Sequence, residues 1–148
     1  MGSRSEAAIW TEQVNDVLAG AGLKHGGARQ RIIDLLADES CALSAVEIED
    51  ALRLHGTPTG RASIYRTLEL LVDYGLVERV AVSRGLTRFE RAHPDGEHHH
   101  HLVCDHCGRL VAFDDPELEE AIDSLPERLG VRVEHHEVVL RGACVDCE

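Results

Sequence analysis

Two pairs of cysteines are the strongest chemical signal in the sequence, Cys104-x-x-Cys107 and Cys144-x-x-Cys147. A C-x-x-C turn presents two sulfurs from one knuckle, and zinc binds four thiolates in a tetrahedron. Residues 108–143 lie between the pairs, so a shared ion would clamp the two ends of this segment. Because four thiolates leave no open coordination position, we predict a structural zinc site and not a catalytic one.

The alternative for these cysteines is two unrelated pairs, either buried or redox-active. Disulfides are not expected, because the start of the chain has no apolar segment typical of a secretory signal. We therefore expect a cytoplasmic, reducing location in which paired cysteines hold metal. The fifth cysteine, Cys41, is expected to be a small buried side chain, and a ligand role stays open.

Four consecutive histidines, His98–His101, directly precede the first cysteine pair. In a strand, successive side chains point to opposite faces, so His99 and His101 would share one face and His98 and His100 the other. Such a strand could supply two different metal sites, since neutral imidazole is a common ligand of divalent transition metals. The alternative interpretation is a solvated polar loop.

Other acids and histidines could complete these sites. Any one of them alone is more often a surface residue, but ten histidines in 148 residues favour metal binding. The candidates are Glu78, Glu90, His93, Glu119, His135 and His136. If the last two lie in a strand, only one of them can share a site with the histidine run.

The first part of the chain is predicted to be helical. Apolar residues recur at helical spacing over residues 8–19, 29–37 and 61–74, and Ser44 with Glu47 forms a capping box that opens a helix to about Leu54. Two short strands, 77–82 and 86–90, follow as a hairpin. This order predicts a winged helix-turn-helix.

The second part is predicted to be a small α/β unit. Residues 110–113 and 131–140 have strand patterns, and Pro116 begins a helix towards Leu129 that Pro126 should kink or split. We predict an α+β protein with two domains, a winged-helix domain over residues 1–91 and a metal-binding dimerisation domain over 92–148. The second domain is small enough to need a metal or a dimer interface for stability.

The net charge of −12 argues against a nucleic-acid partner, but the charges are unevenly distributed. Residues 17–33 and 51–68 contain no acid and carry several cations, so a basic face on an acidic body is expected. A recognition helix needs polar and basic side chains in its N-terminal half. The candidate DNA contacts are Arg61, Ser63, Tyr65, Arg66, Thr67 and, at the hairpin tip, Arg84.

Composition excludes two further classes. Aromatic residues make up only 3% of the chain, too few for a single-strand binder that stacks bases. No apolar run approaches the roughly 18 residues that cross a bilayer, so no membrane partner is expected.

These segments together resemble the ferric uptake regulator family of metal-dependent bacterial repressors. The resemblance rests on Ala21–Lys24 with Arg29, on Ala62–Leu68, on His98–Gly108 and on Gly142–Cys147, in family order across nearly the whole chain. It implies a winged-helix domain, a C-terminal dimerisation domain and metal-gated binding to double-stranded DNA with an inverted repeat. It also implies a homodimer.

The resemblance also implies roles for individual residues. Cys104, Cys107, Cys144 and Cys147 match the structural zinc ligands. His99, His101 and Glu90 match the sensing site near the hinge. The further site of the family is matched by His98, His100, Glu119 and His136. Tyr65 and Arg66 match DNA contacts of the recognition helix, and Lys24 matches a minor-groove contact.

The chain departs from the family pattern at several positions. Ala42 stands near a position that often carries histidine, and Ala112 stands where a carboxylate is common. Zinc-type members are similar in drawing hinge ligands from an acid near Glu78 and a residue near His93. Fewer carboxylates and an added histidine favour zinc over iron or manganese as the regulatory ion.

The resulting hypothesis is a DNA-binding transcriptional repressor of metal-homeostasis genes, with zinc, iron or manganese as the second ion. An iron- or peroxide-sensing regulator of the same family is the nearest alternative. A zinc-dependent hydrolase or a metal-storage module is the alternative from another class. The chain has no H-E-x-x-H motif for the first, and storage would not explain the capped helix-turn-helix.

Overall fold

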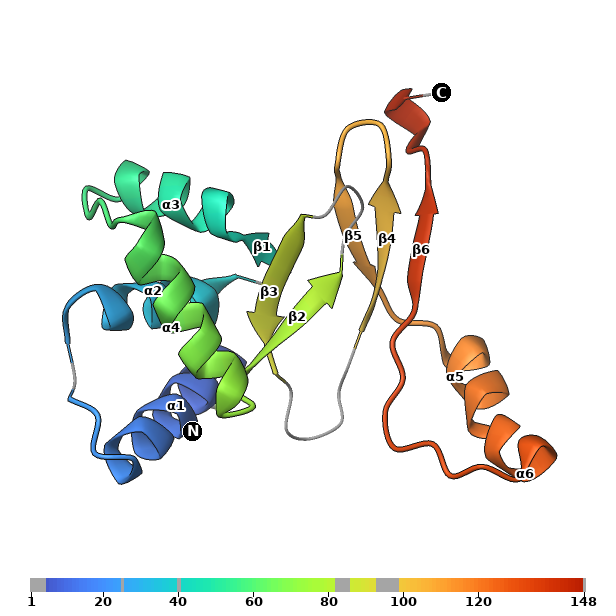
Figure 1. Ribbon diagram of the computed structural model, residues 1–148. Coiled ribbons are helices and arrows are strands. Elements are labelled where there is room, and N and C mark those ends of the chain that lie inside the picture. The colour runs from blue at the N-terminus through green and yellow to red at the C-terminus, as the bar shows by residue number, and fades with distance from the viewer. Residues whose placement is uncertain (1–4, 25, 40, 82–85, 93–98, 148) are drawn as a thin grey trace. The chain divides into compact units, whose positions relative to one another are not determined.

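The structure is a computed structural model that describes residues 5–24, 26–39, 41–81, 86–92 and 99–147. The chain divides into two compact units, Met1–Ala92 and His93–Glu148 (Figure 1). Helices and strands occur in both units, so the prediction of an α+β protein is confirmed. No described helix is both long and apolar enough to cross a membrane.

Four helices build most of the first unit: α1 (Glu6–Gly20), α2 (Gly27–Asp38), α3 (Ala45–Leu54) and α4 (Arg61–Asp73). Their aliphatic stripes meet in one core. The fully buried side chains of this core include Val14, Ile32, Ile33, Ile48, Ile64, Leu68 and Leu71. This packing fixes which side of α4 is left for solvent.

The predicted capping box at the start of α3 is confirmed. The Ser44 hydroxyl accepts a hydrogen bond from the Glu47 amide at 3.1 Å, and the Glu47 carboxylate accepts one from the Ser44 amide at 2.9 Å. Helix α4 ends at Asp73 with Tyr74 as its C-cap, and Gly75 follows with φ of 70°, a left-handed conformation that favours glycine.

A three-stranded sheet completes the first unit. Strands β1 (Leu43–Ser44), β3 (Thr87–Arg91) and β2 (Val77–Ala81) lie in that order, with both pairs antiparallel. The hairpin of β2 and β3 is the predicted wing. Its connection, residues 82–85 with Arg84, lies outside the described residues.

The second unit contains a three-stranded sheet and two short helices. Strand β4 (His100–Cys104) lies between β5 (Leu110–Phe113), which is antiparallel to it, and β6 (Val139–Gly142), which is parallel (Figure 1). A 3₁₀ turn, η2 (Val145–Cys147), follows β6.

Helices α5 (Pro116–Asp123) and α6 (Leu125–Leu129) divide at Ser124, as the proline in this segment predicts. The Asp115 carboxylate accepts hydrogen bonds from the amides of Glu117 and Leu118 and so caps α5.

The long strand expected over residues 131–140 is wrong. Regular pairing begins only at Val139, opposite His101, although the Val138 carbonyl already accepts the His101 amide at 3.1 Å. The alternating pattern remains, and Val131 and Val133 are 59% and 44% exposed. An alternating sequence pattern alone therefore does not make a strand, because a strand is stabilised by pairing with a neighbouring strand.

Candidate metal centres and nucleic-acid interface

The four paired cysteines converge on one point in the second unit. One sulfur from each of Cys104, Cys107, Cys144 and Cys147 lies within 4.8 Å of all the others. The sulfurs of Cys107 and Cys144 are 3.7 Å apart. A tetrahedral zinc with bonds of about 2.3 Å requires sulfur separations of about 3.8 Å, so the donor set fits zinc.

Local backbone geometry builds the two knuckles that present these sulfurs. Gly108, with φ of 75°, donates its amide to the Cys104 carbonyl at 2.9 Å and closes the first turn. The Cys147 amide donates to the Cys144 carbonyl at 2.9 Å within η2. The Asp105 amide donates to the Gly142 carbonyl at 2.8 Å, which ties the two knuckles together.

Hydrogen bonding makes the four thiols unequal. The Cys104 sulfur accepts the amides of Cys144 and Cys107, at 3.4 and 3.5 Å, and these bonds lower its pKa to about 6. Hydrogen bonds with the Cys144 and Cys107 thiols raise the pKa of Cys147 to about 12. A divalent cation would supply the positive charge that lets all four sulfurs ionise together.

A second cluster gathers around the start of β4. The Glu119 carboxylate on α5 contacts the Nε2 atoms of two histidines, His100 through one oxygen and His136, at 2.8 Å, through the other. The two imidazole centroids are 5.3 Å apart. Two imidazoles and a carboxylate form a set of nitrogen and oxygen donors that suits zinc, iron or manganese.

Alternation along β4 separates this cluster from a second imidazole pair. His99 and His101 have ring centroids 4.8 Å apart and do not belong to the group around His100. His101 is almost fully buried, whereas His99 is half-buried. Ala112 lies opposite His101 on β5, so this neighbouring position offers no carboxylate.

The other candidate ligands come from several elements. Glu78 and Glu90 are register partners on β2 and β3, with Glu78 exposed and Glu90 buried. Cys41 is half-buried just before β1, and His135 is exposed. His93 and His98 lie outside the described residues.

The expected DNA contacts lie on the first unit, most of them around one basic hollow. This hollow of about 650 Å³ lies between the start of α2 and the side of α4. It is lined by Lys24, Arg29, Ser63, Arg66 and Thr67 together with small and apolar residues. Tyr65 is 45% exposed on α4. Arg29 was absent from the sequence-based set of contacts, although the acid-free segment 17–33 contains it.

One expectation about charge needs correction. The acid-free segment 51–68 predicts a basic face, yet the guanidinium groups of Arg53 and Arg61 both contact Glu49 of α3. Glu49 lies one helical turn before Arg53 on α3 itself, and packing of α3 against α4 brings it to Arg61. Local sequence composition could not reveal the contact with Arg61.

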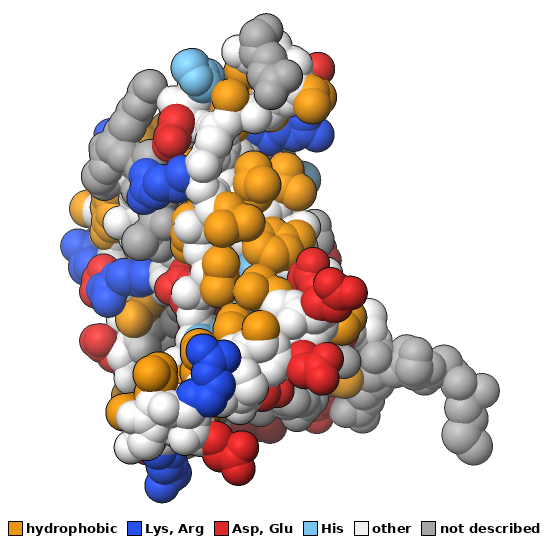
Figure 2. Space-filling model, turned by 90° about the vertical axis from the view of Figure 1, so that its right-hand side faces the viewer, with side chains coloured by type: hydrophobic (Ala, Val, Ile, Leu, Met, Phe, Trp, Pro, Cys, Tyr) orange, Lys and Arg blue, Asp and Glu red, His pale blue; other side chains and the backbone are white. Residues whose placement is uncertain are grey.

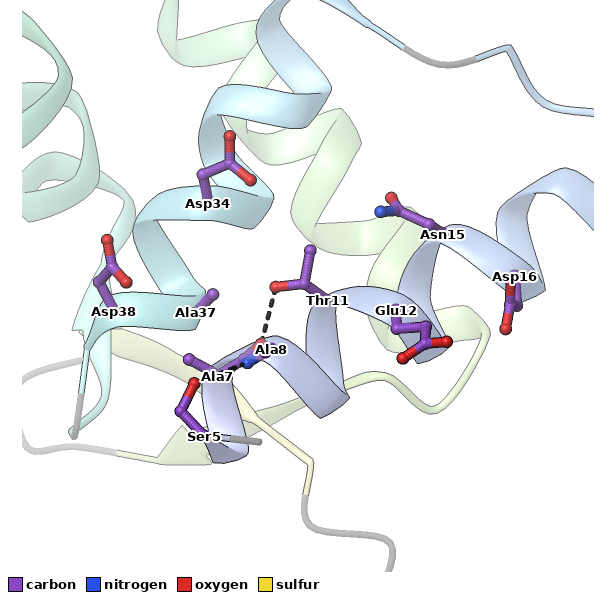
Figure 3. A pocket seen from close by; sticks show the side chains of 10 residues that line it. All are labelled: Ser5, Ala7, Ala8, Thr11, Glu12, Asn15, Asp16, Asp34, Ala37 and Asp38. Atoms are coloured by element: carbon purple, nitrogen blue, oxygen red, sulfur yellow. Dashed lines mark hydrogen bonds between the residues drawn. The ribbon is translucent and has the colours of Figure 1, made fainter. Parts of the chain in front are cut away.

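An acidic hollow of about 620 Å³ lies elsewhere on the first unit, between α1 and α2 (Figure 3). Four carboxylates line it, those of Glu12, Asp16, Asp34 and Asp38. Negative charge here would repel phosphates, so the basic hollow and the exposed side of α4 are the surfaces suited to DNA.

Comparisons with known proteins settle the family. The model of the Ferric uptake regulator family matches residues 20–141. The chain belongs to this family. A ferric uptake regulation protein of Neisseria meningitidis is 34% identical over 142 residues, which cover 93% of this chain and 96% of the relative. Members of the ferric uptake regulator family are metal-responsive transcription regulators and not enzymes.

Solved structures of the family agree with the fold. The Vibrio cholerae ferric uptake regulator aligns with a TM-score of 0.78 and 32% identity, over 88% of this chain and 99% of that one. The Helicobacter pylori ferric uptake regulator, described as having three functional metal-binding sites, aligns with a TM-score of 0.83 and 26% identity over 99% and 97% of the two chains.

Proposed function

We propose that this family member is a homodimeric repressor that binds an inverted-repeat operator in double-stranded DNA and controls metal-homeostasis genes. The observation that carries the proposal is the side-by-side imidazole pair, His99 and His101, at the start of the strand that ends in the four-cysteine cluster. One ion would hold the second unit together. Another, at the imidazole pair, would report the metal supply.

The four cysteines are assigned a structural zinc. Their sulfurs are close enough to share one ion and leave no position open for a substrate. The zinc would join the knuckle after β4 to the knuckle after β6. We assign it to the stability of the second unit and not to sensing.

The regulatory ion is assigned to His99 and His101, with Glu90 and either Glu78 or His93 completing the site. The imidazoles belong to the proposed dimerisation domain, residues 92–148, and the acids to the proposed DNA-binding domain, residues 1–91. An ion bound by both domains would favour one hinge state and thereby one spacing of two recognition helices. His98, His100, Glu119 and His136 are assigned to an additional site.

Base and phosphate contacts are assigned to the first unit. Lys24, Ser63, Arg66 and Thr67 line the basic hollow, and Tyr65 is exposed beside them. Arg61 and the wing residue Arg84 complete the proposed interface. Phosphate contacts would supply most of the affinity, and side chains of α4 would supply the selectivity.

Exposed apolar residues of the second unit support a homodimer. Val111 and Leu140 are register partners of Leu102 on either side of β4, so the three form a row across the sheet. Figure 2 shows hydrophobic side chains gathered on a face of this unit. The exposed apolar residues here are Val111, Leu129, Val131, Val133, Leu140 and Val145. Burial of such a patch between two copies would stabilise both.

We propose zinc as the regulatory ion, because imidazoles predominate in the candidate set and alanine occupies the position opposite His101. Iron is the second candidate, favoured by the relatives named ferric uptake regulation proteins at 33–35% identity. These two proposals differ in the metal and share the residues.

The experiment is a DNA-binding titration with each metal. A duplex is first selected from a randomised library by the zinc-loaded protein, and its affinity is measured with zinc, iron(II) or manganese and with a chelator. We expect at least tenfold tighter binding with the regulatory metal, within the usual range of allosteric coupling.

The His99→Ala variant should lose this metal dependence and keep its basal DNA affinity. His135→Ala, which removes an exposed histidine of the same unit, is the matched control. Equal affinities of the wild-type protein with and without every metal would refute the proposal.

A further inference from the structure

Arg61 carries a positive charge at the N-terminal end of a helix, where a cation is unfavourable. It is the first residue of α4, where the amide ends of the helix carry partial positive charge. The preceding Gly60 provides no side chain to cap those amides. A cation at this position weakens the helix, so its presence calls for an explanation outside helix stability.

Glu49 of α3 holds this arginine. Its Oε2 atom accepts a hydrogen bond from the Arg61 Nε at 2.8 Å. The Glu49 side chain is only 20% exposed and the Arg61 side chain 57%, so the acid is the fixed partner and the arginine extends from it. This contact raises the pKa of Arg61, chiefly through the hydrogen bond.

The neighbouring arginine is held differently. Arg53 contacts the other Glu49 oxygen at 3.4 Å, but it also contacts Asp50 at 3.0 Å. Arg61 has Glu49 as its only hydrogen-bonded side-chain partner in the part of the chain that the structure describes. Loss of Glu49 would therefore free Arg61 while Arg53 kept a carboxylate.

The geometry leaves most of the Arg61 guanidinium available. Of its five N–H donors, one is used by Glu49 and the terminal nitrogens keep four. A guanidinium oriented in this way can donate two parallel hydrogen bonds to the O6 and N7 acceptors of guanine in the major groove. The N-terminal end of a recognition helix is where such base contacts are made.

Charge distinguishes a base contact from a phosphate contact. An arginine that served only to neutralise phosphate would be more effective without a carboxylate beside it, because the acid repels the DNA backbone. The Glu49 carboxylate lowers the affinity for DNA of any sequence but fixes the orientation of Arg61, as expected for a contact that selects a base. Arg66 offers a contrast, since its guanidinium donates a hydrogen bond to the neutral Ser63 hydroxyl at 3.1 Å.

We propose that Glu49 is a positioning residue that orients Arg61 towards a guanine of the DNA site and so contributes to sequence selectivity. This inference rests on the proposed DNA-binding function and adds a residue to it. Glu49 does not touch DNA in this account, and its effect passes through Arg61.

The test measures selectivity, defined as the ratio of affinities for two duplexes. One is the duplex selected from a random library by the wild-type protein, and the other is a scrambled duplex of equal length and composition. Glu49→Ala should lower this ratio about tenfold, since a bidentate base contact discriminates by roughly 1–3 kcal/mol. Affinity for the scrambled duplex should stay equal or rise, because one negative charge is removed.

Two further variants make the test specific. Glu69→Ala removes an exposed glutamate that pairs with Arg79, also between α4 and a neighbouring element, and should leave the ratio unchanged. Arg61→Ala should lower the ratio as much as Glu49→Ala does. The double variant should lower it no further than Arg61→Ala alone.

The outcomes separate the alternatives. A general loss of folded protein lowers the affinities for both duplexes together, whereas the proposal predicts a lower affinity for the selected duplex only. An unchanged ratio in Glu49→Ala, or a further loss in the double variant, would overturn the positioning role. If the wild-type protein selects no sequence at all, the proposed function fails together with this inference.

Discussion

Strand β4 begins at His100 and ends at Cys104, and each of these residues belongs to a cluster of a different kind. In the cluster at the end of the strand, four thiols face one another, and full ionisation of all four would place four negative charges together. In the cluster at the start, two imidazoles share one carboxylate, and their hydrogen bonds already balance donors and acceptors. The four thiols can all ionise only if a cation neutralises them, whereas the imidazoles and the carboxylate are stabilised by their own hydrogen bonds without a metal ion.

This difference separates a permanent site from an exchangeable one. Structural zinc binds zinc-finger peptides with about 10–16 kcal/mol, which is comparable with the whole stability of a small domain, about 5–15 kcal/mol. An imidazole–carboxylate set binds an ion in competition with its own hydrogen bonds and with protons. Occupancy of such a set can follow the metal supply, and occupancy of the thiolate set should not.

The largest expected effect follows from removal of one thiolate. Cys104→Ser should reduce bound zinc from one ion per chain to a small fraction and speed amide exchange at the two knuckles, because the ion joins the turns that follow β4 and β6. Elemental analysis and amide hydrogen exchange measure the two effects. The first unit should remain protected from exchange, since its core is aliphatic.

Cys41→Ser is the matched control for this variant. Cys41 is half-buried in the first unit and outside the four-cysteine cluster. It should retain one zinc per chain and unaltered amide exchange at the two knuckles. An unaltered zinc content in Cys104→Ser would contradict the assignment of the four cysteines to a permanent zinc site.

Protons provide a second test of the thiolate cluster. The Cys104 pKa of about 6 lies below the ordinary thiol value of 9.0, so folding favours its thiolate. This contribution is complete above about pH 9 and is lost as the pH falls through about 6. Zinc uptake by reduced, metal-free protein should therefore release about one more proton per chain at about pH 5 than at about pH 7.5.

Calorimetric titration in two buffers of different ionisation enthalpy measures this proton release. The raised pKa of Cys147, about 12, means that its own proton must leave at either pH. Equal proton counts at the two pH values would show that the backbone amides do not keep Cys104 ionised.

A smaller effect is expected at the imidazole–carboxylate cluster. Glu119→Gln keeps a hydrogen-bonding side chain but removes the charge between His100 and His136. It should lose one equivalent of added divalent metal and lower the free energy of unfolding by only about 1–2 kcal/mol. Equilibrium dialysis and denaturant unfolding measure these changes. Loss of the thiolate-bound zinc in this variant would contradict the independence of the two clusters.

The smallest effect concerns the first unit, which should not need metal. Ser44→Ala removes the hydroxyl of the capping box and should lower the free energy of unfolding by about 1 kcal/mol. The decrease should be the same with zinc and with a chelator, as measured by denaturant unfolding. A metal-dependent decrease would mean that the first unit also relies on a bound ion.

The sequence predicted those features that depend on local pattern or on ligand spacing. The capping box at Ser44, the helix break at Ser124 and the convergence of the cysteine pairs all follow from such signals. The strand predicted over 131–140 is paired only from Val139, because an alternating pattern does not specify which of its residues have a neighbouring strand. Likewise, the contact of Glu49 with Arg61 depends on how α3 packs against α4. Alternation in the histidine run predicted two groups of imidazoles, whereas the placing of Glu119 beside His100 and His136 followed from the family resemblance and not from local pattern.

The most direct test of the division between a permanent and an exchangeable ion is a titration that counts metal and DNA binding together. Protein containing only its tightly held zinc is titrated with further zinc or iron(II), while its affinity for the selected duplex is followed by fluorescence anisotropy. We predict weak binding with one ion per chain and at least tenfold tighter binding when a second ion is taken up. Full DNA affinity with the first ion alone would contradict the account.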